Sequence, residues 1–415
     1  MAARARITVV TSGHLSTCPR MLKSADALAE AGYQVRAVAT RHEPWATDAD
    51  ADVRSRRSWP VEVVDYRRDG GAATYWRTGV EHRAARAAVA AVGPGRAPLP
   101  IAARAFGRVH TSMVRAIAAA PADLIYGGTT GALAAIAEAA RRTGTPYALD
   151  LEDFHSGETS GPAASLVDAL AARIEEAVLT GATFLTTSSE AIADAYRERY
   201  GVRPSVVHNT FPLPPQPPDF TRADSGLLRV YWFSQTIGAG RGLEDAIAAL
   251  GRAGVRADVT LRGRPHPGYL ECLATLASAH APRVTLRHQP PAPPDAMVDL
   301  ARVHDVGLAL EHGEPRNRAL CLTNKVFTYL LAGLAIAGFD TPGQHDLGID
   351  LGRAASLAPC GDIDALAGAF SRWASDPAAL DCARRTAWEA AVRRWHWEHG
   401  EERGTLYRLV RETLS

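Results

Sequence analysis

A glycine-rich segment with an internal arginine marks a possible anion site in this sequence. GAGRGLE (238–244) follows an apolar run and precedes a helical pattern, so the backbone N–H groups around Gly238 and Gly240 could donate to a phosphate. Its third glycine has the wrong spacing for a dinucleotide-binding fingerprint, and no suitable acid ends the following strand. Arg241 supplies a cation within the segment. We therefore interpret it as a phosphate-binding loop, with a simple glycine-rich turn as the alternative.

Two more arginines end the next strand. The run LRGRP carries Arg262 and Arg264 toward the edge of the sheet at which the glycine-rich segment is expected. Arginines at two neighbouring strand ends could neutralise a diphosphate, an anion that favours charge-assisted donors.

Lysine is rare in this chain. It occurs only at positions 23 and 325, so 44 of the 46 basic residues are arginine. Lys325 lies near the start of the apolar segment LTNKVFTYLLAGLAIAGF (322–339). Because a lysine offers a compact point charge that an arginine does not reproduce, we interpret Lys325 as a ligand-binding cation. A role in anchoring the helix is the alternative.

An acid-rich segment, LDLEDFHSGE (149–158), follows a buried strand in the first half of the chain. Its titratable residues are Asp150, Glu152, Asp153, His155 and Glu158. Such groups are costly beside a buried strand unless they serve a site, although Asp153 could instead cap a helix. No His and acid residues have the spacing of metal ligands, so no metal site is predicted.

Arg20 is the second residue of a predicted helix, directly after Pro19. A cation is unfavourable at a helix start, because the helix dipole is positive there. We therefore expect Arg20 to form a salt bridge or to contact a ligand.

Short apolar runs alternate with helical patterns along nearly the whole chain. The predicted strands are residues 7–12, 34–40, 61–66, 124–128, 147–151, 184–189, 205–209, 228–235, 258–263, 284–289, 306–312, 334–339 and 355–359. Helical patterns include residues 20–31, 132–142 and 164–179. Nearly continuous apolar strands separated by helices are typical of parallel sheets covered on both faces. The sequence therefore predicts an α/β protein with two Rossmann-like, doubly wound domains facing across a cleft.

A proline-rich segment separates the two halves. Five of the eight residues 211–218 are proline, which excludes a helix or a central strand there. The predicted organisation is an N-terminal domain (1–212), a proline-rich linker (213–227), a C-terminal domain (228–395) and a charged, amphipathic C-terminal helix (396–415). That helical pattern already begins with RRWHWE, at residue 393.

Composition excludes several classes of protein. A net charge of +1, without zinc-finger spacing or a basic-aromatic stripe, gives no indication of nucleic-acid binding. The five scattered cysteines favour a reducing compartment. The N-terminus lacks the long apolar core of a signal peptide, and the longest apolar run is too short to span a bilayer. A cytoplasmic protein without stable membrane insertion is expected.

Five stretches together resemble the retaining, GT-B-fold glycosyltransferases of family 4. They are CPRMLKSADALAEAGYQV, YALDLEDF, VVHNTFP, NKVFTYLLAGLAIAGFD and RWHWE, which occur in the family's order over essentially the full length. The resemblance implies hexosyl transfer from a nucleotide-sugar, a UDP- or GDP-sugar, bound by the C-terminal domain. The acceptor would bind the N-terminal domain, and the terminal helix would pack back on that domain. No metal or other cofactor is implied, because cations and a helix N-terminus stabilise the leaving diphosphate.

The same resemblance assigns roles to individual residues. Catalytic roles are implied for Glu152, Asp153, His155, Arg241 and Lys325. Donor-binding roles are implied for Gly238, Gly240, Arg241, Arg262, Arg264, Glu311, Asn324, Lys325 and Thr328. His14, Arg20 and Asn209 are expected on the acceptor side.

Some positions depart from the family pattern. Thr328 and Leu320 stand where the family commonly has two glutamates, and Glu311 or Glu314 would have to substitute for one of them. Thr236 stands at the position of a second phosphate-binding cation. A nucleotide-sugar epimerase, or a non-catalytic sugar-binding or partner protein with the same fold, is therefore the alternative function.

A basic region is expected on the acceptor side. Residues 51–115 contain 12 arginines and five acids. Such a region suits an acidic acceptor or weak association with an anionic membrane surface, although a solvated helix face would look the same. We favour a small-molecule acceptor.

Overall fold

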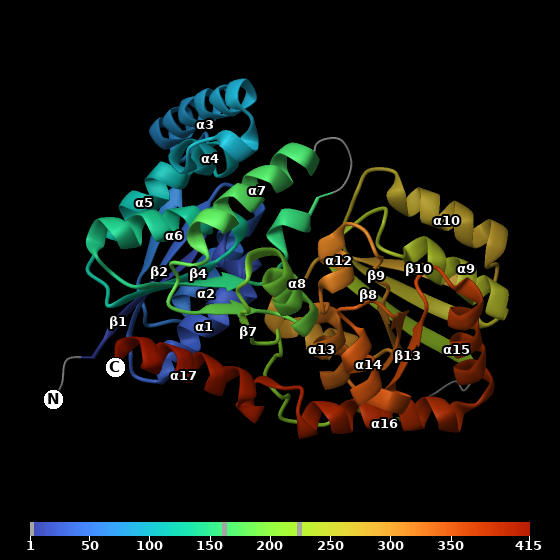
Figure 1. The fold of residues 1–415 in the computed structure, drawn as a ribbon. Helices are drawn as coiled ribbons and strands as arrows, with labels where there is room; N and C mark the ends of the chain where they lie inside the picture. Colours follow the sequence, from blue (N-terminus) through green and yellow to red (C-terminus); the bar gives the residue numbers. More distant parts are fainter. Residues whose placement is uncertain (1–3, 160–163, 222–225) are drawn as a thin grey trace. The chain divides into compact units, whose positions relative to one another are not determined.

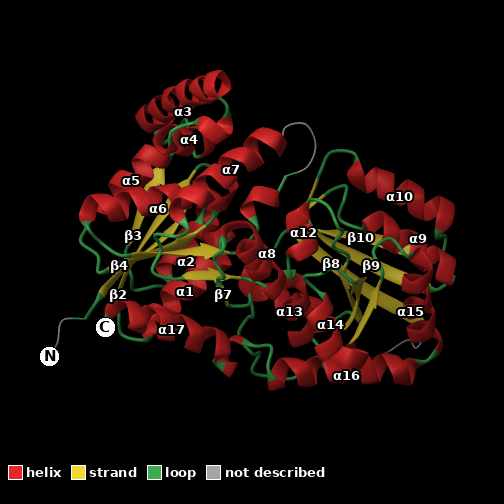
Figure 2. Cartoon of the chain, viewed as in Figure 1, coloured by secondary structure: helices red, strands yellow, loops and turns green. Residues whose placement is uncertain are grey.

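The computed structural model describes residues 4–159, 164–221 and 226–415, and these fall into two compact units. The first unit comprises the described residues of Met1–His208 together with Glu402–Ser415, and the second those of Asn209–Glu401. Residues 213–227, for which the sequence predicts a linker, belong to the second unit where they are described. Figures 1 and 2 show the elements of each unit.

The first unit is built on a seven-stranded parallel sheet. Its strands are β1 (Arg6–Thr11), β2 (Gln34–Arg41), β3 (Val61–Asp65), β4 (Leu124–Gly128), β5 (Tyr147–Leu151), β6 (Leu185–Thr187) and β7 (Ser205–Val206). Their order in the sheet is β3-β2-β1-β4-β5-β6-β7. The chain therefore reverses its direction of travel between β1 and β4, the kind of position at which open parallel sheets bind ligands.

Helices cover both faces of this sheet. They are α1 (Pro19–Glu30), α2 (Trp45–Ser55), α3 (Ala72–Val92), α4 (Leu99–Phe106), α5 (His110–Ala118), α6 (Thr130–Thr143), α7 (Ala164–Val178), α8 (Glu190–Tyr200) and α17 (Glu401–Leu414). The terminal helix α17 buries Leu406, Leu409 and Val410 in the core formed by α1, β1 and β2. Helices α3 and α4 share a smaller apolar cluster with α7, outside the layer that covers the sheet (Figure 1).

The second unit has a six-stranded parallel sheet. Its strands are β8 (Leu227–Ile237), β9 (Arg256–Pro265), β10 (Val284–Gln289), β11 (Val306–Ala309), β12 (Ala335–Phe339) and β13 (Ala355–Ala358), in the order β10-β9-β8-β11-β12-β13. Its helices are α9 (Leu243–Ala253), α10 (Tyr269–His280), α11 (Met297–Ala301), α12 (Arg316–Leu320), α13 (Asn324–Leu331), α14 (His345–Leu351), α15 (Ile363–Ser375) and α16 (Pro377–Arg393). One core joins α9, α10 and α15 to the sheet, and a second joins α13, α14 and α16 to its other side.

Local sequence signals explain where several helices begin and end. Pro19 occupies the first turn of α1, where its missing N–H costs nothing. Ser189 caps α8 by accepting a hydrogen bond from the Ile192 N–H at 3.2 Å. Gly201 ends the same helix in the left-handed conformation that glycine adopts without strain.

The prediction of two doubly wound α/β units is confirmed, with differences at element boundaries. All thirteen predicted strands are present, but β6 and β7 are only three and two residues long. The prediction of one terminal helix from residue 393 is wrong, because Gly400 has a φ of 96° and the helix begins only at Glu401. Within the described part of the chain, none of the helices combines the length and the apolar character needed to cross a bilayer.

Candidate functional site

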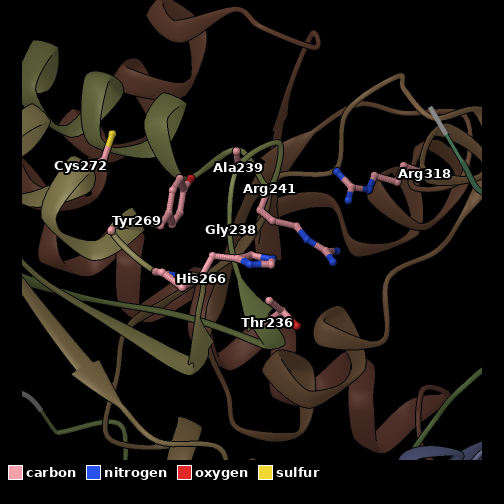
Figure 3. Close-up of a pocket in the computed structure, with 10 residues that line it drawn as sticks. Thr236, Gly238, Ala239, Arg241, His266, Tyr269, Cys272 and Arg318 are labelled. Carbon is pink, nitrogen blue, oxygen red and sulfur yellow. The ribbon is translucent and has the colours of Figure 1, made fainter. Parts of the chain in front are cut away.

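A polar cavity of about 600 Å³ lies at the carboxyl ends of β8 and β9, entirely within the second unit. Thr236, Gly238, Arg241, His266 and Arg318 are among the residues that line it. Figure 3 shows the side chains of Arg241, His266 and Arg318 directed toward the same space. The cavity therefore occupies the edge of a parallel sheet at which ligands usually bind.

Glycines shape the loop between β8 and α9. Gly240 and Gly242 have φ angles of 69° and 71°, which side chains other than glycine rarely tolerate. A Cβ atom at Gly238 would lie 2.4 Å from Cδ2 of His266, and one at Gly242 would lie 2.5 Å from Cβ of Leu310. Glycine is thus required at Gly238 and Gly242 because a Cβ atom would clash with a neighbouring residue, and at Gly240 and Gly242 because of the positive φ angle.

Two helices start beside this cavity without a side-chain cap. Gly242 precedes α9 and Gly268 precedes α10, and neither residue has a side chain that could accept from the first N–H groups. The acids in the first turn of α9 already have partners. Glu244 accepts a hydrogen bond from the hydroxyl of Tyr269, which lines the cavity, and Asp245 forms an ion pair with His312 at 3.1 Å. Uncapped helix starts of this kind favour the binding of an anion.

Arginines from two separate segments meet at the cavity. Arg241 comes from the glycine-rich loop, and Arg318 comes from α12 and donates a hydrogen bond to the carbonyl of Gly240. Burial lowers the pKa of Arg318 below its ordinary value, and the neighbouring charge of Arg241 lowers it further. The two guanidinium groups therefore repel each other, and a bound anion would relieve this repulsion.

A buried ion pair lies next to these arginines. Lys325 Nζ is 2.7 Å from Glu311 Oε1 and 2.9 Å from Thr323 Oγ1, and both charged side chains are only 10% exposed. Burial raises the pKa of Glu311, but Lys325, Arg241 and Arg318 together outweigh that effect and hold the pKa below its usual range. Three cations thus face one carboxylate, a net charge of +2 (three minus one) that matches a diphosphate in magnitude.

Lys325 does not itself line the cavity. Its short contacts with Glu311 and Thr323 favour the anchoring role that the sequence left as an alternative. Asn324 is half-buried and Thr328 is fully buried on the same helix, and neither lines the cavity. Their donor-binding roles stay predictions.

The arginines at the end of β9 are also outside the cavity lining. Arg262 donates to the Tyr231 hydroxyl at 2.9 Å and to the Pro290 carbonyl at 2.8 Å. Arg264 is exposed at the end of the same strand. The second arginine that lines the cavity, beside Arg241, is therefore Arg318. The donor-binding roles of Arg262 and Arg264 stay predictions.

Sequence reasoning missed Arg318, His266 and Tyr269. Arg318 lies on a five-residue helix in a segment without a recognisable pattern, so only the folded chain brings it to the loop at Gly240. His266 and Tyr269 belong to PHPGY, directly at the end of β9. The prolines and the glycine of this segment predict a turn between a strand and a helix, and this is the sequence signal that could have indicated His266 and Tyr269.

In the first unit, Arg20 forms a buried network with Asp150. Two guanidinium nitrogens of Arg20 each lie 2.7 Å from an oxygen of Asp150, and Arg20 also donates to the carbonyls of Val207 and Thr187. Both charged side chains are at most 3% exposed. The salt bridge expected for Arg20 is therefore present, and it ties α1 to the carboxyl end of β5.

His155 lies in a short helical turn after β5, among acids. Its Nδ1 contacts Glu158 Oε1 and lies 2.8 Å from Thr130 Oγ1, while its Nε2 is buried without a hydrogen-bond partner among the described residues. Burial lowers the pKa of His155, but Glu158, Glu175 and Asp153 outweigh it and raise the pKa to about 9. His155 is thus a buried cation at neutral pH whose Nε2–H has no acceptor among the described residues.

The remaining predicted residues of this site lie nearby or elsewhere in the chain. Glu152 and Asp153 are half-buried directly after β5. His14 is buried, with Nδ1 2.6 Å from Asp50 and Nε2 accepting from the backbone N–H groups of His42 and Glu43. Because both ring nitrogens are occupied, His14 can position this edge but has no nitrogen left for a ligand. Asn209 is buried and is the first residue of the second unit.

Thr129 marks the switch point of the first sheet. It has a φ of 71°, which is unusual for a residue other than glycine, and it directly precedes α6. Its Oγ1 accepts from the Ser12 N–H at 2.9 Å and lies 2.7 Å from Ser12 Oγ. Backbone strain of this kind is often held at ligand-binding sites, and no sequence pattern indicates it here.

Among the described residues, no group of three or more His, Cys, Asp or Glu side chains is arranged to hold a metal ion.

The structure consists of two doubly wound parallel-sheet units, and a cavity lined by Arg241 and Arg318 lies at a strand edge of the second. The chain has the GT-B fold of glycosyltransferases, as comparison with solved structures shows. Residues 19–210 match the family model described as a glycosyl transferase 4-like domain. The resemblance to family 4 GT-B glycosyltransferases inferred from sequence is confirmed.

Three solved structures illustrate the likeness. Anabaena Alr3699/HepE in complex with UDP and glucose is 17% identical, with a TM-score of 0.64 and 99% of each chain covered. Sucrose-phosphate synthase from Thermosynechococcus elongatus is 13% identical, with a TM-score of 0.69 and the same coverage. A glycosyltransferase from Rickettsia africae is 9% identical, with a TM-score of 0.67 over 100% of this chain and 99% of the other. A search of curated protein sequences gave no match.

Proposed function

We propose that this protein is a retaining glycosyltransferase that moves a sugar from a UDP-sugar to a small-molecule acceptor without a metal ion. The observation that carries the proposal is the cavity at Arg241 and Arg318, where two cations meet two uncapped helix starts. A structurally similar protein, Anabaena Alr3699/HepE, has been crystallised with UDP-glucose, which favours UDP among the nucleotides.

The geometry supports a specific part for each group in the donor half. The N–H groups of the glycine-rich loop and the guanidinium groups of Arg241 and Arg318 bind the donor diphosphate. As the bond between the sugar and the diphosphate breaks, these groups stabilise the negative charge on the leaving oxygen. The acceptor oxygen bonds to the sugar carbon on the same face, and its proton passes to the diphosphate.

The first unit supplies the acceptor side in this proposal. Glu152, Asp153 and His155 follow β5 at the ligand-binding edge of the sheet. Because His155 is cationic below about pH 9, its charge can stabilise a negative charge that develops at this edge of the sheet.

Nucleotide recognition tests the donor assignment directly. UDP should raise the melting temperature of the purified protein more than GDP, ADP or TDP at the same concentration, because a ligand that binds only the folded state stabilises it. Release of UDP from UDP-glucose and other UDP-sugars then tests catalysis. An unchanged melting temperature with all four nucleotides would refute the donor site. UDP binding without UDP release from any UDP-sugar would instead support the non-catalytic alternative.

Metal removal should leave the rate of UDP release unchanged. The negative charge of the diphosphate is offset by Arg241 and Arg318, with Lys325 beside them, so a divalent cation is not required for charge balance. The measurement compares the rate before and after dialysis against EDTA. Loss of activity on dialysis that magnesium or manganese restores would contradict the proposed mechanism.

A further inference from the structure

A second cavity, of about 670 Å³, lies wholly within the first unit. It is formed where β2 and β3 end, and the start of α3 and the residue Arg108 complete it. These strands are neighbours in the sheet, and their carboxyl ends lie at the edge that also carries the switch point between β1 and β4. The location is therefore one at which a doubly wound sheet can bind a ligand, and none of the predicted site residues lines it.

Flat side chains form part of the wall of this cavity. The rings of His42 and Tyr66 are stacked, with centroids 5.2 Å apart and an angle of 21° between their planes. Tyr75 lies close by, with the guanidinium carbon of Arg108 4.2 Å from its ring centroid and 5.7 Å from that of Tyr66. A wall made of flat side chains favours a planar ligand that can pack against it.

Two arginines in the cavity wall lack a carboxylate partner among the described residues. Arg68 is exposed and makes no ion pair or hydrogen bond with the described part of the chain. Arg108 donates to the Tyr75 carbonyl at 2.8 Å and to Thr78 Oγ1 at 3.4 Å, which are both uncharged groups. By contrast, Arg67 is neutralised by Asp65 at 2.8 Å.

The charges of the whole cluster leave a positive excess. Four arginines, Arg41, Arg67, Arg68 and Arg108, face the three acids Glu43, Asp65 and Asp69, a sum of +1. A bound anion could form ion pairs with the guanidinium groups of Arg68 and Arg108, which have no carboxylate partner among the described residues.

We propose that this cavity binds the acceptor, and that the acceptor carries a planar ring and a negatively charged group. The ring packs against the wall formed by His42, Tyr66 and Tyr75, and the charged group pairs with Arg68 and Arg108. The role as an acceptor rests on the proposed glycosyltransferase function, whereas the binding of a planar anion can be tested without a donor.

Three small hydroxylated probes separate the two requirements. 4-Hydroxybenzoate has a flat ring and a carboxylate, its methyl ester has the ring without the charge, and 4-hydroxycyclohexanecarboxylate has the charge without the flat ring. Titration of the full chain, followed by calorimetry or by ligand NMR, should show the tightest binding for 4-hydroxybenzoate. Equal affinity for all three probes, or no binding of any, would overturn the proposal.

A matched pair of variants locates the binding. Arg68→Ala should weaken the binding of 4-hydroxybenzoate about three- to fivefold, as expected for one partly exposed ion pair, and should leave the affinity of the methyl ester unchanged. Arg115→Ala is the control, because Arg115 is an exposed arginine of the same unit that does not line the cavity. An equal loss in both variants would indicate a general charge effect and would overturn the site.

The outcomes distinguish this inference from the proposed function. UDP release from a UDP-sugar, with no binding of the ring acid, would refute the inference and leave the function intact. Binding of the ring acid by a protein that releases no UDP would refute its role as an acceptor site together with the catalytic function.

Discussion

Replacing Arg241 by alanine is expected to lower the rate of UDP release from the UDP-sugar by about two to three orders of magnitude, similar to the loss of one preorganised group that stabilises developing charge. The residue is half-buried at the wall of a cavity and is not part of an apolar core. Its removal also relieves the repulsion with Arg318. The melting temperature of the unliganded variant should therefore remain close to that of the native protein.

The rate of UDP release, the affinity for UDP and the melting temperature are measured together for this variant. Arg353→Ala is the matched control, because Arg353 is an exposed arginine of the same unit outside the cavity lining. Arg318→Ala should show a loss in the same direction, since its guanidinium shares the site. Near-normal turnover in Arg241→Ala would refute the assignment of the phosphate site.

The fold was largely predictable because the strands of a covered parallel sheet are apolar along their whole length. Val9 and Val10, for example, are adjacent in β1 and both are buried, since they pack against helices on opposite faces of the sheet. Boundaries were less predictable where backbone conformation decides them. The positive φ of Gly400 separates α17 from the residues before it, although the pattern of charged residues continues across this position.

The glycine-rich loop could be recognised because its chemistry is contiguous in sequence. Gly238, Gly240 and Arg241 stand within four residues of one another, and the structure places the loop at a cavity. Arg318, in contrast, is 78 residues from the carbonyl of Gly240 to which it donates. No local pattern indicates such a contact, because it depends on how α12 packs beside the sheet.

The arginines of the second cavity also could not be selected from the sequence alone. The excess of arginines in residues 51–115 is visible in the sequence, but the sequence does not show which of them are paired with acids. Asp65 neutralises Arg67, whereas its neighbour Arg68 has no such partner among the described residues. Which charges remain available for a ligand therefore follows from pairing, which a count of charges does not reveal.

Lys325→Met is expected to destabilise the protein, because it leaves Glu311 buried without its counter-ion. Breaking one side of a buried ion pair typically costs about 3–5 kcal/mol, which corresponds to a fall of several degrees in melting temperature. The contact of 2.7 Å and the 10% exposure of both side chains place this pair in that class. Because the pKa of Glu311 is lowered in the folded protein, the stabilisation should be present at neutral pH and should be lost as the pH falls through that pKa.

The double variant Lys325→Met with Glu311→Gln separates anchoring from direct donor binding. It removes both charges of the pair, so much of the stability should return, while Arg241 and Arg318 keep the same excess charge of +2 at the cavity. If Lys325 acts mainly by holding Glu311, the affinity for UDP should recover together with the melting temperature. Recovery of the melting temperature without recovery of UDP affinity would show that the ammonium itself contacts the donor. An unchanged melting temperature in Lys325→Met alone would contradict the anchoring role. Compared with Lys325→Met, Lys325→Arg should restore only part of the melting temperature and of the affinity for UDP, because a planar guanidinium does not reproduce the point contact of an ammonium.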